Sequence, residues 1–463
     1  MAVIGSLLRV SNYAHVIQKG SKFVFINSLF LKPLVSDLDE YVLFNSLVTG
    51  ERNINSLTES EKQFISALER IKVLVKSEDV DKSVINNIRS TIGNPCPTVV
   101  YFIVTEKCNF NCRYCFVNDS LESNHAKKEI MTSETAINGW EFFKKKTLEG
   151  NIQSDSERHV IIYGGEPLTN FETVVQLLNT IQKDISAKKI PYKVNVTINT
   201  NGSLLDDEKI ELLKKYGVTL AISLDGSKES NVDRVFATGE ETFDTVYSNI
   251  EKAVKQSANT SLSITLNHKA INHFEDTINT ILKLNVKNIG YNLLMPRTDN
   301  KLDSNYSVNA SKFLIDSYKL LKNNGIYEDR IMRKINAFMK RELYIHDCAA
   351  TGGAQLVIAP NGDIGLCQGL LGNKMFKISS LQEDFDFENN ETVRKWANRS
   401  PIFLQTCQKC RALGICGGGC PKNSIVRYGD INYLDENFCT HTKMTFDWLL
   451  DCLVNSLNEN TND

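Results

Sequence analysis

Three cysteines stand close together in the stretch TEKCNFNCRYCF, residues 105–116. Cys108, Cys112 and Cys115 have the spacing C-x3-C-x2-C. Thiolates bind zinc ions and iron–sulfur clusters. A structural zinc site takes about four protein ligands, whereas three cysteines can hold three irons of a [4Fe–4S] cube and leave the last iron to an exogenous ligand. The spacing therefore raises the question of what the remaining ligand is.

A second group of cysteines lies in the C-terminal part of the chain. Its seven members are Cys348, Cys367, Cys407, Cys410, Cys416, Cys420 and Cys439. Four of them have the spacing C-x2-C-x5-C-x3-C. In a reducing compartment, cysteines clustered in this way indicate metal binding rather than a disulfide framework. Cys96 and Cys452 fit neither group and are predicted to be ordinary small buried residues.

Between residues 97 and 300, short apolar runs alternate with stretches whose apolar residues recur three and four apart. The runs are TVVYFIV, HVIIYGG, VNVTIN, VTLAIS, SLSITLN and NIGYNLL. Strands that alternate with helices predict an α/β fold with a parallel sheet, whose working groups lie at the carboxyl ends of the strands. Since Cys108 follows the first run, the first cysteine group is expected at that edge.

The flanking segments predict further units. Residues 1–92 contain HVIQKGSKFVFIN, which indicates a β-hairpin, followed by helices from Asp37 and from Thr58, where Glu61 can complete a capping box. This order predicts a winged-helix-like domain; the alternative is an extension packed on the next domain. Residues 301–347 are predicted to be a helical linker with Gly325 at a helix end. Residues 348–463 carry the second cysteine group and end in a helix near MTFDWLLDCLVNSL.

Size and charge limit the partners of the chain. It has 463 residues, 42% of them hydrophobic, and 53 basic against 55 acidic residues give a net charge of −2. This balance gives no electrostatic case for nucleic acid or an anionic membrane as the main partner. The apolar stretch FVFINSLFLKPLV is interrupted and too short to span a bilayer, and no secretory signal precedes it. We therefore expect a cytoplasmic protein that is not bound to a membrane.

The residues Cys108, Cys112, Tyr114 and Cys115 resemble the hallmark C-x3-C-x-aromatic-C of the radical S-adenosylmethionine (SAM) enzymes. The resemblance implies a partial (β/α)6 radical SAM barrel and a [4Fe–4S] cluster held by the three cysteines. The amino and carboxylate groups of SAM would complete that cluster. Cleavage of SAM would then give methionine and a 5′-deoxyadenosyl radical, which can abstract hydrogen from an unactivated C–H bond.

The same resemblance implies SAM contacts at successive strand ends. YGGEP would receive the SAM ammonium, and its two glycines would let the backbone approach a ligand. NTNG would face the ribose, SLDG offers a hydroxyl, and NVDRV supplies an arginine whose planar fork suits the SAM carboxylate. With Tyr114, the implied SAM-binding residues are Gly164, Gly165, Glu166, Asn201, Ser223 and Arg234. Each match is a weak signal alone, and their common order strengthens them.

The second cysteine group resembles the SPASM domain, an extension of radical SAM enzymes that modify peptides and proteins. The resemblance implies two auxiliary [4Fe–4S] clusters, one held by Cys407, Cys410, Cys416 and Cys439, the other by Cys348, Cys367 and Cys420. The latter cluster would lie nearer the active site. Its remaining ligand could be His346 or Asp347. Cys96 or Cys452 are further possibilities, or the position could stay free for the thiolate of a substrate cysteine.

These resemblances imply a radical SAM oxidoreductase that acts on a peptide. The favoured function is the installation of thioether cross-links, as in sactipeptides or ranthipeptides, in a ribosomally made precursor. The N-terminal domain would capture the leader as an added β-strand, with FVFIN as the docking edge. A flavodoxin or ferredoxin would supply electrons.

Other functions remain open at this point. Within the class, they are carbon–carbon cross-linking or another oxidation of a peptide, and formylglycine formation in sulfatases. Gln368 disfavours the last, because enzymes of that type carry an aspartate at the matching position. From a different class, a non-enzymatic iron–sulfur carrier or peptide-binding chaperone is the alternative, but it leaves Glu166, Ser223 and Arg234 unexplained.

Overall fold

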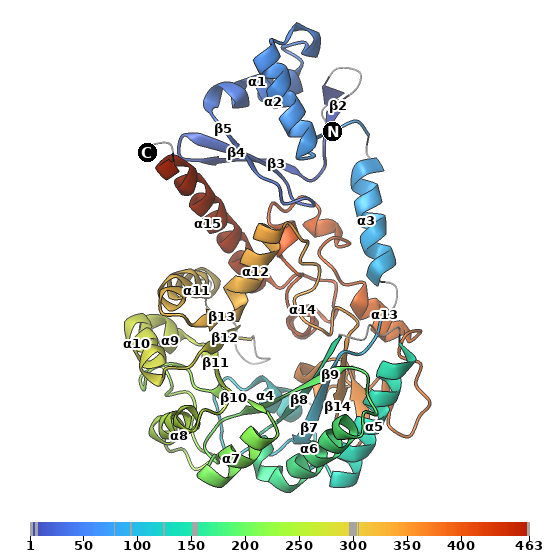
Figure 1. The fold of residues 1–463 in the computed structure, drawn as a ribbon, viewed down its shortest axis with the longest axis vertical. Helices are drawn as coiled ribbons and strands as arrows, with labels where there is room; N and C mark the ends of the chain where they lie inside the picture. The colour runs from blue at the N-terminus through green and yellow to red at the C-terminus, as the bar shows by residue number, and fades with distance from the viewer. Residues whose placement is uncertain are drawn as a thin grey trace.

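The computed structural model describes residues 3–4, 8–77, 79–92, 95–123, 126–150, 156–295, 303 and 305–460. The predicted barrel boundary at residue 300 lies outside these residues. Figure 1 shows the N-terminal strands and helices at the top, the C-terminal segment in the middle and a curved sheet with its helices at the bottom.

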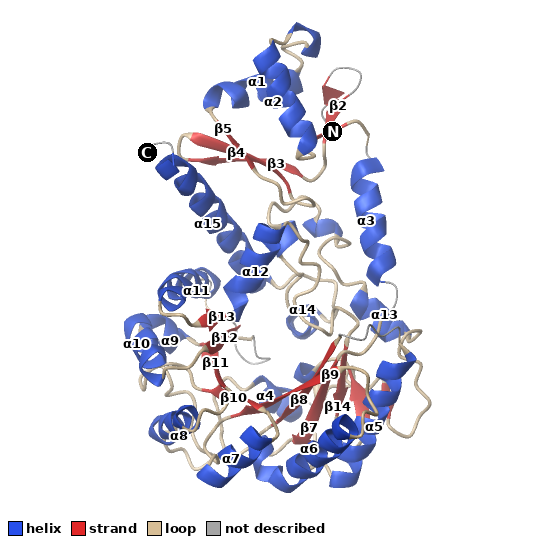
Figure 2. Cartoon of the chain, in the orientation of Figure 1, coloured by secondary structure: helices blue, strands red, loops and turns tan. Residues whose placement is uncertain are grey.

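All six predicted strands are present and lie side by side in one sheet. They are β7 (Val99–Thr105), β8 (Glu157–Gly164), β9 (Lys193–Thr200), β10 (Thr219–Ser223), β11 (Thr260–Leu266) and β12 (Asn288–Leu293). Neighbours in this series pair in parallel. The connecting helices are α4 (Phe116–Ser123), α5 (Ser133–Glu149), α6 (Phe171–Ser186), α7 (Asp207–Lys215), α8 (Phe243–Lys255), α9 (His268–Asn272) and α10 (Phe274–Leu284). Figure 2 shows that helices α5 to α8 and α10 lie along the outer face of the curved sheet, as expected for crossover connections.

The sheet continues at both ends beyond the predicted strands. β13 (Tyr327–Glu328) pairs in parallel with β12, and β14 (Gln355–Ile358) pairs in parallel with β7. β15 (Asp363–Gly365) and β16 (Ser379–Ser380) extend it with antiparallel pairs. Since β14 belongs to the segment after Cys348, the predicted C-terminal domain is hydrogen-bonded directly to the strand that precedes the first cysteine group.

Helix α5 shows how the layers are held together. Trp140 and Phe143 on its inner face are fully buried. Gly139 brings the helix close to the sheet, because a Cβ atom there would lie 2.8 Å from Phe102 of β7 and 2.9 Å from Ile358 of β14. The helix therefore covers the junction between the barrel and the C-terminal segment, and any larger side chain at Gly139 would push the two layers apart.

The predicted hairpin is present as β3 (Ala14–Lys19) and β4 (Lys22–Asn27), but FVFIN is not an edge. β5 (Leu34–Ser36) pairs with the other side of β4, so β4 is the central strand. Phe23 and Phe25 pack in a core with helices α1 (Leu38–Thr49) and α2 (Glu59–Arg70). Val24 and Ile26 pack in a core with α15 (Glu436–Asn460) on the opposite face. The prediction of FVFIN as the docking edge is wrong, because a run without polar alternation is buried on both faces.

Helices follow the hairpin, as predicted, but one further strand of the N-terminal unit comes after α2. β1 (Val3–Ile4), β2 (Leu8–Val10) and β6 (Leu74–Val75) form a second antiparallel sheet, and α3 (Asp79–Ile92) follows. The predicted capping box of α2 is confirmed, since Glu61 N donates to Thr58 Oγ1 at 3.4 Å and Thr58 N donates to the Glu61 carboxylate at 2.8 Å.

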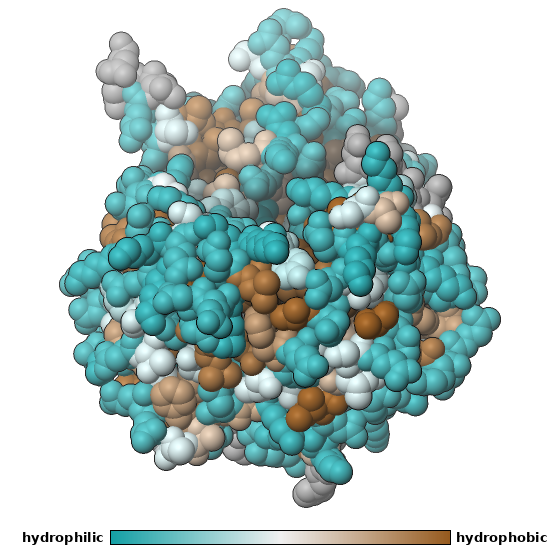
Figure 3. Space-filling model, turned by 60° about the horizontal axis from the view of Figure 1, so that its bottom comes forward, coloured by the Kyte–Doolittle hydropathy of each residue, from teal (hydrophilic) through white to brown (hydrophobic). Residues whose placement is uncertain are grey.

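The predicted linker contains α11 (Tyr306–Asn323) and α12 (Asp329–Lys340), with β13 between them. Gly325 has a φ of +70° just after α11, as expected at a helix end. The C-terminal segment adds α13 (Glu391–Ala397), α14 (Pro421–Tyr428) and α15. No helix among the described residues has the length and apolarity needed to cross a membrane. The face seen in Figure 3 is mostly hydrophilic, with apolar residues in small groups.

Candidate functional site

The loop after β7 places the first cysteine group at the carboxyl edge of the sheet. Cys108, Cys112 and Cys115 lie between β7 and α4. The backbone N–H of Phe110 donates to Cys108 Sγ at 3.3 Å, and that of Asn118 donates to Cys115 Sγ at 3.4 Å. Burial raises the pKa of Cys108 to about 12 and that of Cys112 to about 11. These thiols therefore need a metal beside them to become thiolates near neutral pH.

The two glycines of YGGEP allow β8 to approach this loop. A Cβ atom at Gly164, where φ is +153°, would lie 2.2 Å from the Thr105 carbonyl oxygen. A Cβ atom at Gly165 would lie 2.3 Å from the Lys107 carbonyl oxygen. The sequence suggested that these glycines let the backbone approach a ligand. In the structure the close approach is to the backbone that carries Cys108, so side chains at either position would displace the cysteine loop.

Glu166 ties the end of β8 to the end of β9. Its side chain is fully buried, and its carboxylate accepts hydrogen bonds from Thr200 Oγ1 at 2.7 Å, Asn201 N at 2.7 Å and Leu168 N at 3.0 Å. Burial raises the pKa of Glu166. A carboxylate can accept about four hydrogen bonds, so one acceptor position is left for a ligand ammonium.

Asn201 joins the end of β9 to the cysteine loop. Its Nδ2 donates to Asn109 Oδ1 at 2.8 Å and lies 3.9 Å from Cys108 Sγ. Its Oδ1 accepts hydrogen bonds from Ser203 N at 3.0 Å and Ser203 Oγ at 2.8 Å. The structure therefore brings Cys108, Glu166 and Asn201 together, as the order of the motifs predicted.

Arg234 and Tyr114 meet beside an acid that sequence reasoning missed. Arg234 Nη1 donates to Tyr114 OH at 3.0 Å and lies 4.0 Å from Asp225 Oδ1. The Tyr114 hydroxyl donates to the Asp225 carboxylate. Arg234 and Asp225 are buried, and Arg234 Nε has no hydrogen-bond partner among the described residues. That unsatisfied donor fits a bound carboxylate.

A signal for Asp225 was available in the sequence. It stands in SLDG, the motif from which Ser223 was chosen, and a charged side chain just after a strand is informative. The structure places Ser223 as the half-buried last residue of β10. Asp225 holds Tyr114 and also accepts a hydrogen bond from Thr265 N at 3.1 Å, which fixes the aromatic residue of the cysteine motif against the barrel.

Four C-terminal cysteines surround one small cavity. Cys407, Cys410, Cys416 and Cys439 line a space of about 20 Å³ together with Pro401, Leu413, Thr442 and Lys443. Cys407 is the last residue of the short 3-10 helix η4 (Gln405–Cys407), Cys410 and Cys416 lie on either side of the 3-10 helix η5 (Leu413–Ile415), and Cys439 lies in the first turn of α15. We call this space the four-cysteine cavity.

The other three C-terminal cysteines surround a larger cavity. Cys348, Cys367 and Cys420 line a space of about 180 Å³, which we call the three-cysteine cavity. Its wall includes Tyr101 of β7, Leu293 of β12 and Phe116, the residue after Cys115. The cavity therefore extends from the C-terminal segment to the barrel strands and to the first cysteine loop.

The candidate additional ligands differ in whether they line the three-cysteine cavity. Among the described residues, no fourth cysteine and no histidine lines this cavity, whereas Asp347 and Asp435 do. Asp435 already accepts hydrogen bonds from Asn423 Nδ2 at 2.9 Å, Cys420 N at 3.3 Å and Phe438 N at 3.3 Å. His346 therefore does not line this cavity, and Asp347 is the one predicted alternative that does.

The two leftover cysteines lie away from both cavities. Cys96 borders a different space, next to Lys146 and Glu149. Cys452 is exposed on α15, so the prediction that it is a buried residue is wrong. An apolar sequence neighbourhood did not bury Cys452, because only one stripe of a helix can face the core.

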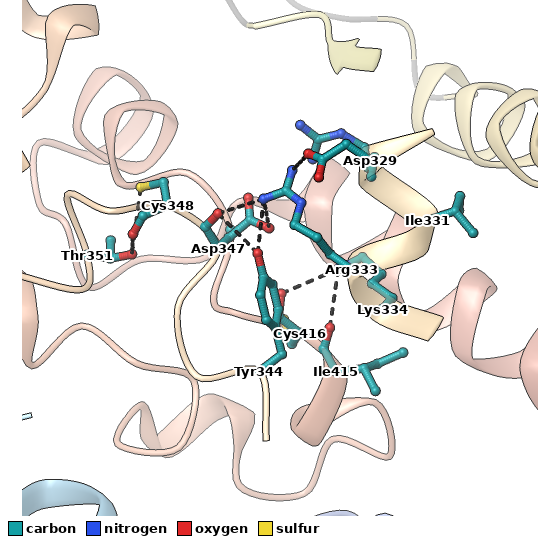
Figure 4. Close-up of polar contacts among 12 residues, drawn as sticks. Asp329, Ile331, Arg333, Lys334, Tyr344, Asp347, Cys348, Thr351, Ile415 and Cys416 are labelled. Carbon is teal, nitrogen blue, oxygen red and sulfur yellow. Dashed lines mark hydrogen bonds and ion pairs between the residues drawn. The ribbon is translucent and has the colours of Figure 1, made fainter. Parts of the chain in front are cut away.

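Helix α12 contacts a loop of each cysteine set, as Figure 4 shows. Arg333 Nη1 donates to the carbonyl oxygen of Asp347 at 2.9 Å and to Tyr344 OH at 3.0 Å. Lys334 Nζ donates to the carbonyl oxygens of Ile415 and Cys416 at 3.3 and 3.4 Å. Two consecutive residues of one helix therefore hold the loop before Cys348 and the loop that carries Cys416.

The cysteine arrangement fits iron–sulfur clusters better than single metal ions. Among the described residues, no three His, Cys, Asp or Glu side chains are placed to ligate one metal ion. In a [4Fe–4S] cluster each thiolate binds a different iron, so the ligands surround a volume rather than a point. The walls of the two cavities supply four thiols in one case and three in the other.

Comparisons with known proteins identify relatives of this chain. Residues 102–281 match the family model of the radical SAM superfamily. The chain is 28% identical over 451 residues to the radical SAM cyclopropyl synthase TigE of Paramaledivibacter caminithermalis, a match that covers 93% of this chain and 85% of TigE. It is 23% identical over 366 residues to a cysteine-type anaerobic sulfatase-maturating enzyme of Clostridium perfringens, covering 76% of this chain and 95% of that enzyme.

Two solved structures have a similar fold. Native anSMEcpe with bound AdoMet has a TM-score of 0.65 at 20% identity, covering 78% of this chain and 99% of that one. SuiB of Streptococcus suis bound to the precursor peptide SuiA has a TM-score of 0.51 at 14% identity, covering 95% of this chain and 100% of that one. Residues 102–281 therefore form a radical SAM domain, and the members of that superfamily use SAM and a [4Fe–4S] cluster.

Proposed function

We propose that this protein is a maturase that oxidises a ribosomally made precursor peptide and carries two auxiliary [4Fe–4S] clusters in a SPASM-type C-terminal domain. The observation that carries the proposal is the division of seven cysteines between two cavities, four around one and three around the other. The three-cysteine cavity reaches the barrel, where a substrate held near SAM would lie. The fold shared with SuiB, which binds a precursor peptide, supports a peptide substrate.

The residues at the strand ends would bind and orient SAM. Glu166 retains an acceptor position for the SAM ammonium, and Arg234 Nε is the available donor for its carboxylate. Asn201 and Ser223 would face the ribose, while Asp225 fixes Tyr114. When bound at Cys108, Cys112 and Cys115, the cluster and SAM supply a 5′-deoxyadenosyl radical that abstracts hydrogen from carbon. The role of the surrounding chain is to position one substrate carbon and exclude water.

The finer proposal is a thioether bond between a cysteine sulfur and a carbon of the same peptide. Its support is the composition of the three-cysteine cavity. Asp435 caps α15 there, and Asp347 is the other acid in the wall. A substrate thiolate therefore fits as the additional ligand, where contact with iron would hold it deprotonated and oriented.

Carbon–carbon bond formation within the peptide is the second candidate. It is favoured by the similarity to TigE, a cyclopropyl synthase, over 93% of this chain. The similarity to sulfatase-maturating enzymes covers less of the chain, and Gln368 stands where such enzymes carry an aspartate. Formylglycine formation is therefore the weakest of the three reactions.

The N-terminal unit would recognise the leader of the precursor as a winged-helix-like element. Because β4 is central in its sheet, FVFIN is not available for an added strand. Of the two edge strands, β3 has six residues and β5 has three, so β3 is the proposed docking edge. Backbone hydrogen bonds along β3 would supply affinity, and neighbouring side chains would supply selectivity. A flavodoxin or ferredoxin is the proposed electron donor.

The test is anaerobic co-expression with the small open reading frames beside the gene, followed by tandem mass spectrometry. A thioether removes two hydrogen atoms and protects the cysteine from alkylation, whereas a carbon–carbon bond removes two hydrogen atoms and leaves the thiol reactive. Formylglycine formation removes the sulfur. Modification of cysteine-free peptides alone would contradict the thioether. The Cys112→Ala protein is the control, and any modification by it would contradict radical SAM chemistry.

A further inference from the structure

Three buried cations lie near the cysteine cavities, one on α12 and two in the C-terminal segment. Lys334, Arg399 and Lys422 have exposed fractions of 1%, 1% and 2%. Lys334 binds the carbonyl oxygens of Ile415 and Cys416. Arg399 binds the carbonyl oxygens of Gly418 at 2.7 Å and Tyr433 at 3.1 Å. These two cations hold backbone loops in place.

Lys422 differs from the other two. Its Nζ has no hydrogen-bond partner among the described residues, although the side chain lines the three-cysteine cavity. The Nζ atom lies 5.6 Å from the centre of the Phe116 ring. The stem passes over Gly369, where a Cβ atom would lie 3.1 Å from Lys422 Cγ. The ammonium is therefore held between the loop of Cys367, its own neighbour Cys420 and the residue after Cys115.

A buried ammonium that donates no hydrogen bond is costly. The charges of Asp119 and Asp435 act on Lys422 without accepting a hydrogen bond from it, so this position favours further negative charge on the cysteine side of the cavity. The cysteines of the cavity would supply that charge through a cluster, because a [4Fe–4S] group with thiolate ligands is a net anion and becomes more negative when reduced. A cation held beside the cluster at low dielectric stabilises the reduced form more than the oxidised form.

We propose that Lys422 is a positioning residue whose ammonium is the counter-charge of the cluster at Cys348, Cys367 and Cys420 and raises the reduction potential of that cluster. The proposal rests on the auxiliary clusters of the proposed function. One side chain would thus set part of the reduction potential of the cluster that lies next to the proposed substrate site.

The experiment is a redox titration followed by electron paramagnetic resonance, on the full chain reconstituted with iron and sulfide. All proteins carry Cys108→Ala, Cys112→Ala and Cys115→Ala, so that only the auxiliary clusters are measured. The Lys422→Met protein is compared with Lys422→Arg, which keeps the charge. The matched control is Lys146→Met, which removes a lysine that is 8% exposed and paired with Glu149 at 2.8 Å, away from both cysteine cavities.

We expect Lys422→Met to shift one of the two midpoint potentials to a more negative value and to leave the other unchanged. Lys422→Arg should restore the shifted potential, and Lys146→Met should change neither. Unchanged potentials in Lys422→Met would overturn the proposal, including the case in which only KM for the peptide changes. If Lys422→Met loses about four irons per chain, retention of those irons by Lys422→Arg supports the proposal and their loss overturns it. If the potentials do not change in Lys422→Met, only the role of Lys422 is wrong and the proposal of peptide oxidation stands. If the wild-type chain binds no auxiliary iron, the proposed auxiliary clusters themselves are wrong.

Discussion

The two C-terminal cavities differ in size, surroundings and number of cysteines. The four-cysteine cavity of about 20 Å³ is bordered by the 3-10 helices and α15, and its wall holds enough thiolates for every iron of a cube. The three-cysteine cavity of about 180 Å³ is bordered by barrel strands and by Phe116. The four-cysteine cavity therefore resembles a structural metal site. The three-cysteine cavity resembles a site that can also bind an exogenous ligand.

The surroundings of the two cavities indicate that one serves stability and the other serves the reaction. The four-cysteine loops pack in cores shared with the N-terminal unit and α15, so a cluster there would hold the domain together. The three-cysteine loops face a cavity, and Cys348 is exposed to it. We expect a cluster there to contribute less to the stability of the fold and to have more contact with substrate.

The largest effect is expected from Cys416→Ala in the four-cysteine cavity. Iron should fall from about twelve to about eight per reconstituted chain, and the melting temperature should fall steeply because metal binding and folding are coupled at such sites. Iron analysis and thermal unfolding measure both changes. An iron loss without a change in melting temperature would show that this cavity is not structural.

Cys348→Ala in the three-cysteine cavity should separate function from stability. We expect a loss of about four irons per chain and of peptide modification, with SAM cleavage to 5′-deoxyadenosine retained. The melting temperature should change much less than in Cys416→Ala, because Cys348 is exposed. Cleavage is measured by chromatography under dithionite; its loss in this variant would mean that the two sites are not separable.

Lys334→Met should weaken the four-cysteine loop selectively. The change removes hydrogen bonds to the carbonyl oxygens of Ile415 and Cys416, and buried acceptors left without donors cost about 3 kcal/mol in total. Urea unfolding measures this loss. Lys319→Met is the control, since Lys319 is exposed and paired with Asp316 on α11, and it should change the free energy of unfolding by less than about 0.5 kcal/mol. Equal effects of the two variants would contradict the assigned role.

Glu328→Gln, at the start of α12, should give the smallest effect and should act on both cavities equally. Burial raises the pKa of Glu328 to about 7, from an ordinary value of 4.5. Because the folded state then binds the proton more tightly than the unfolded state, stability is present below pH 4.5 and is lost as the pH rises through 7. We expect the wild type to lose about 2 kcal/mol between pH 5 and 8 and the variant to lose less. Parallel pH profiles of melting temperature for the two proteins would contradict this.

The sequence patterns that succeeded were those set by local physics. The six strands, the capping box of Thr58 and Glu61 and the position of Gly325 each depend on neighbouring residues or on simple periodicity. Such features are readable because a few consecutive residues determine them. The division of the C-terminal cysteines into the two sets that line the two cavities was implied by the resemblance to the SPASM domain, and spacing alone would have grouped Cys420 with Cys407, Cys410 and Cys416.

The features that were missed depend on residues distant in the chain. β14 joins the sheet through β7, more than two hundred residues away, and short buried runs carry no periodicity that identifies them. The prediction of FVFIN as an edge strand is wrong because the segments that cover it, β5 and α15, lie elsewhere in the chain. Asp225 and Lys422 acquire their roles only when folding places them beside Tyr114 and the three-cysteine cavity.

We expect the three-cysteine cavity to accept a ligand from outside the chain and the four-cysteine cavity to accept none. Pulsed electron paramagnetic resonance with isotopically labelled 2-mercaptoethanol tests it directly, using the chain with Cys108→Ala, Cys112→Ala and Cys115→Ala. We predict a hyperfine coupling from the label to one reduced auxiliary cluster, abolished by Cys348→Ala. If neither cluster shows a coupling at saturating thiol, a protein residue occupies the remaining ligand position of the cluster at Cys348, Cys367 and Cys420, and the expectation of an exogenous ligand is wrong.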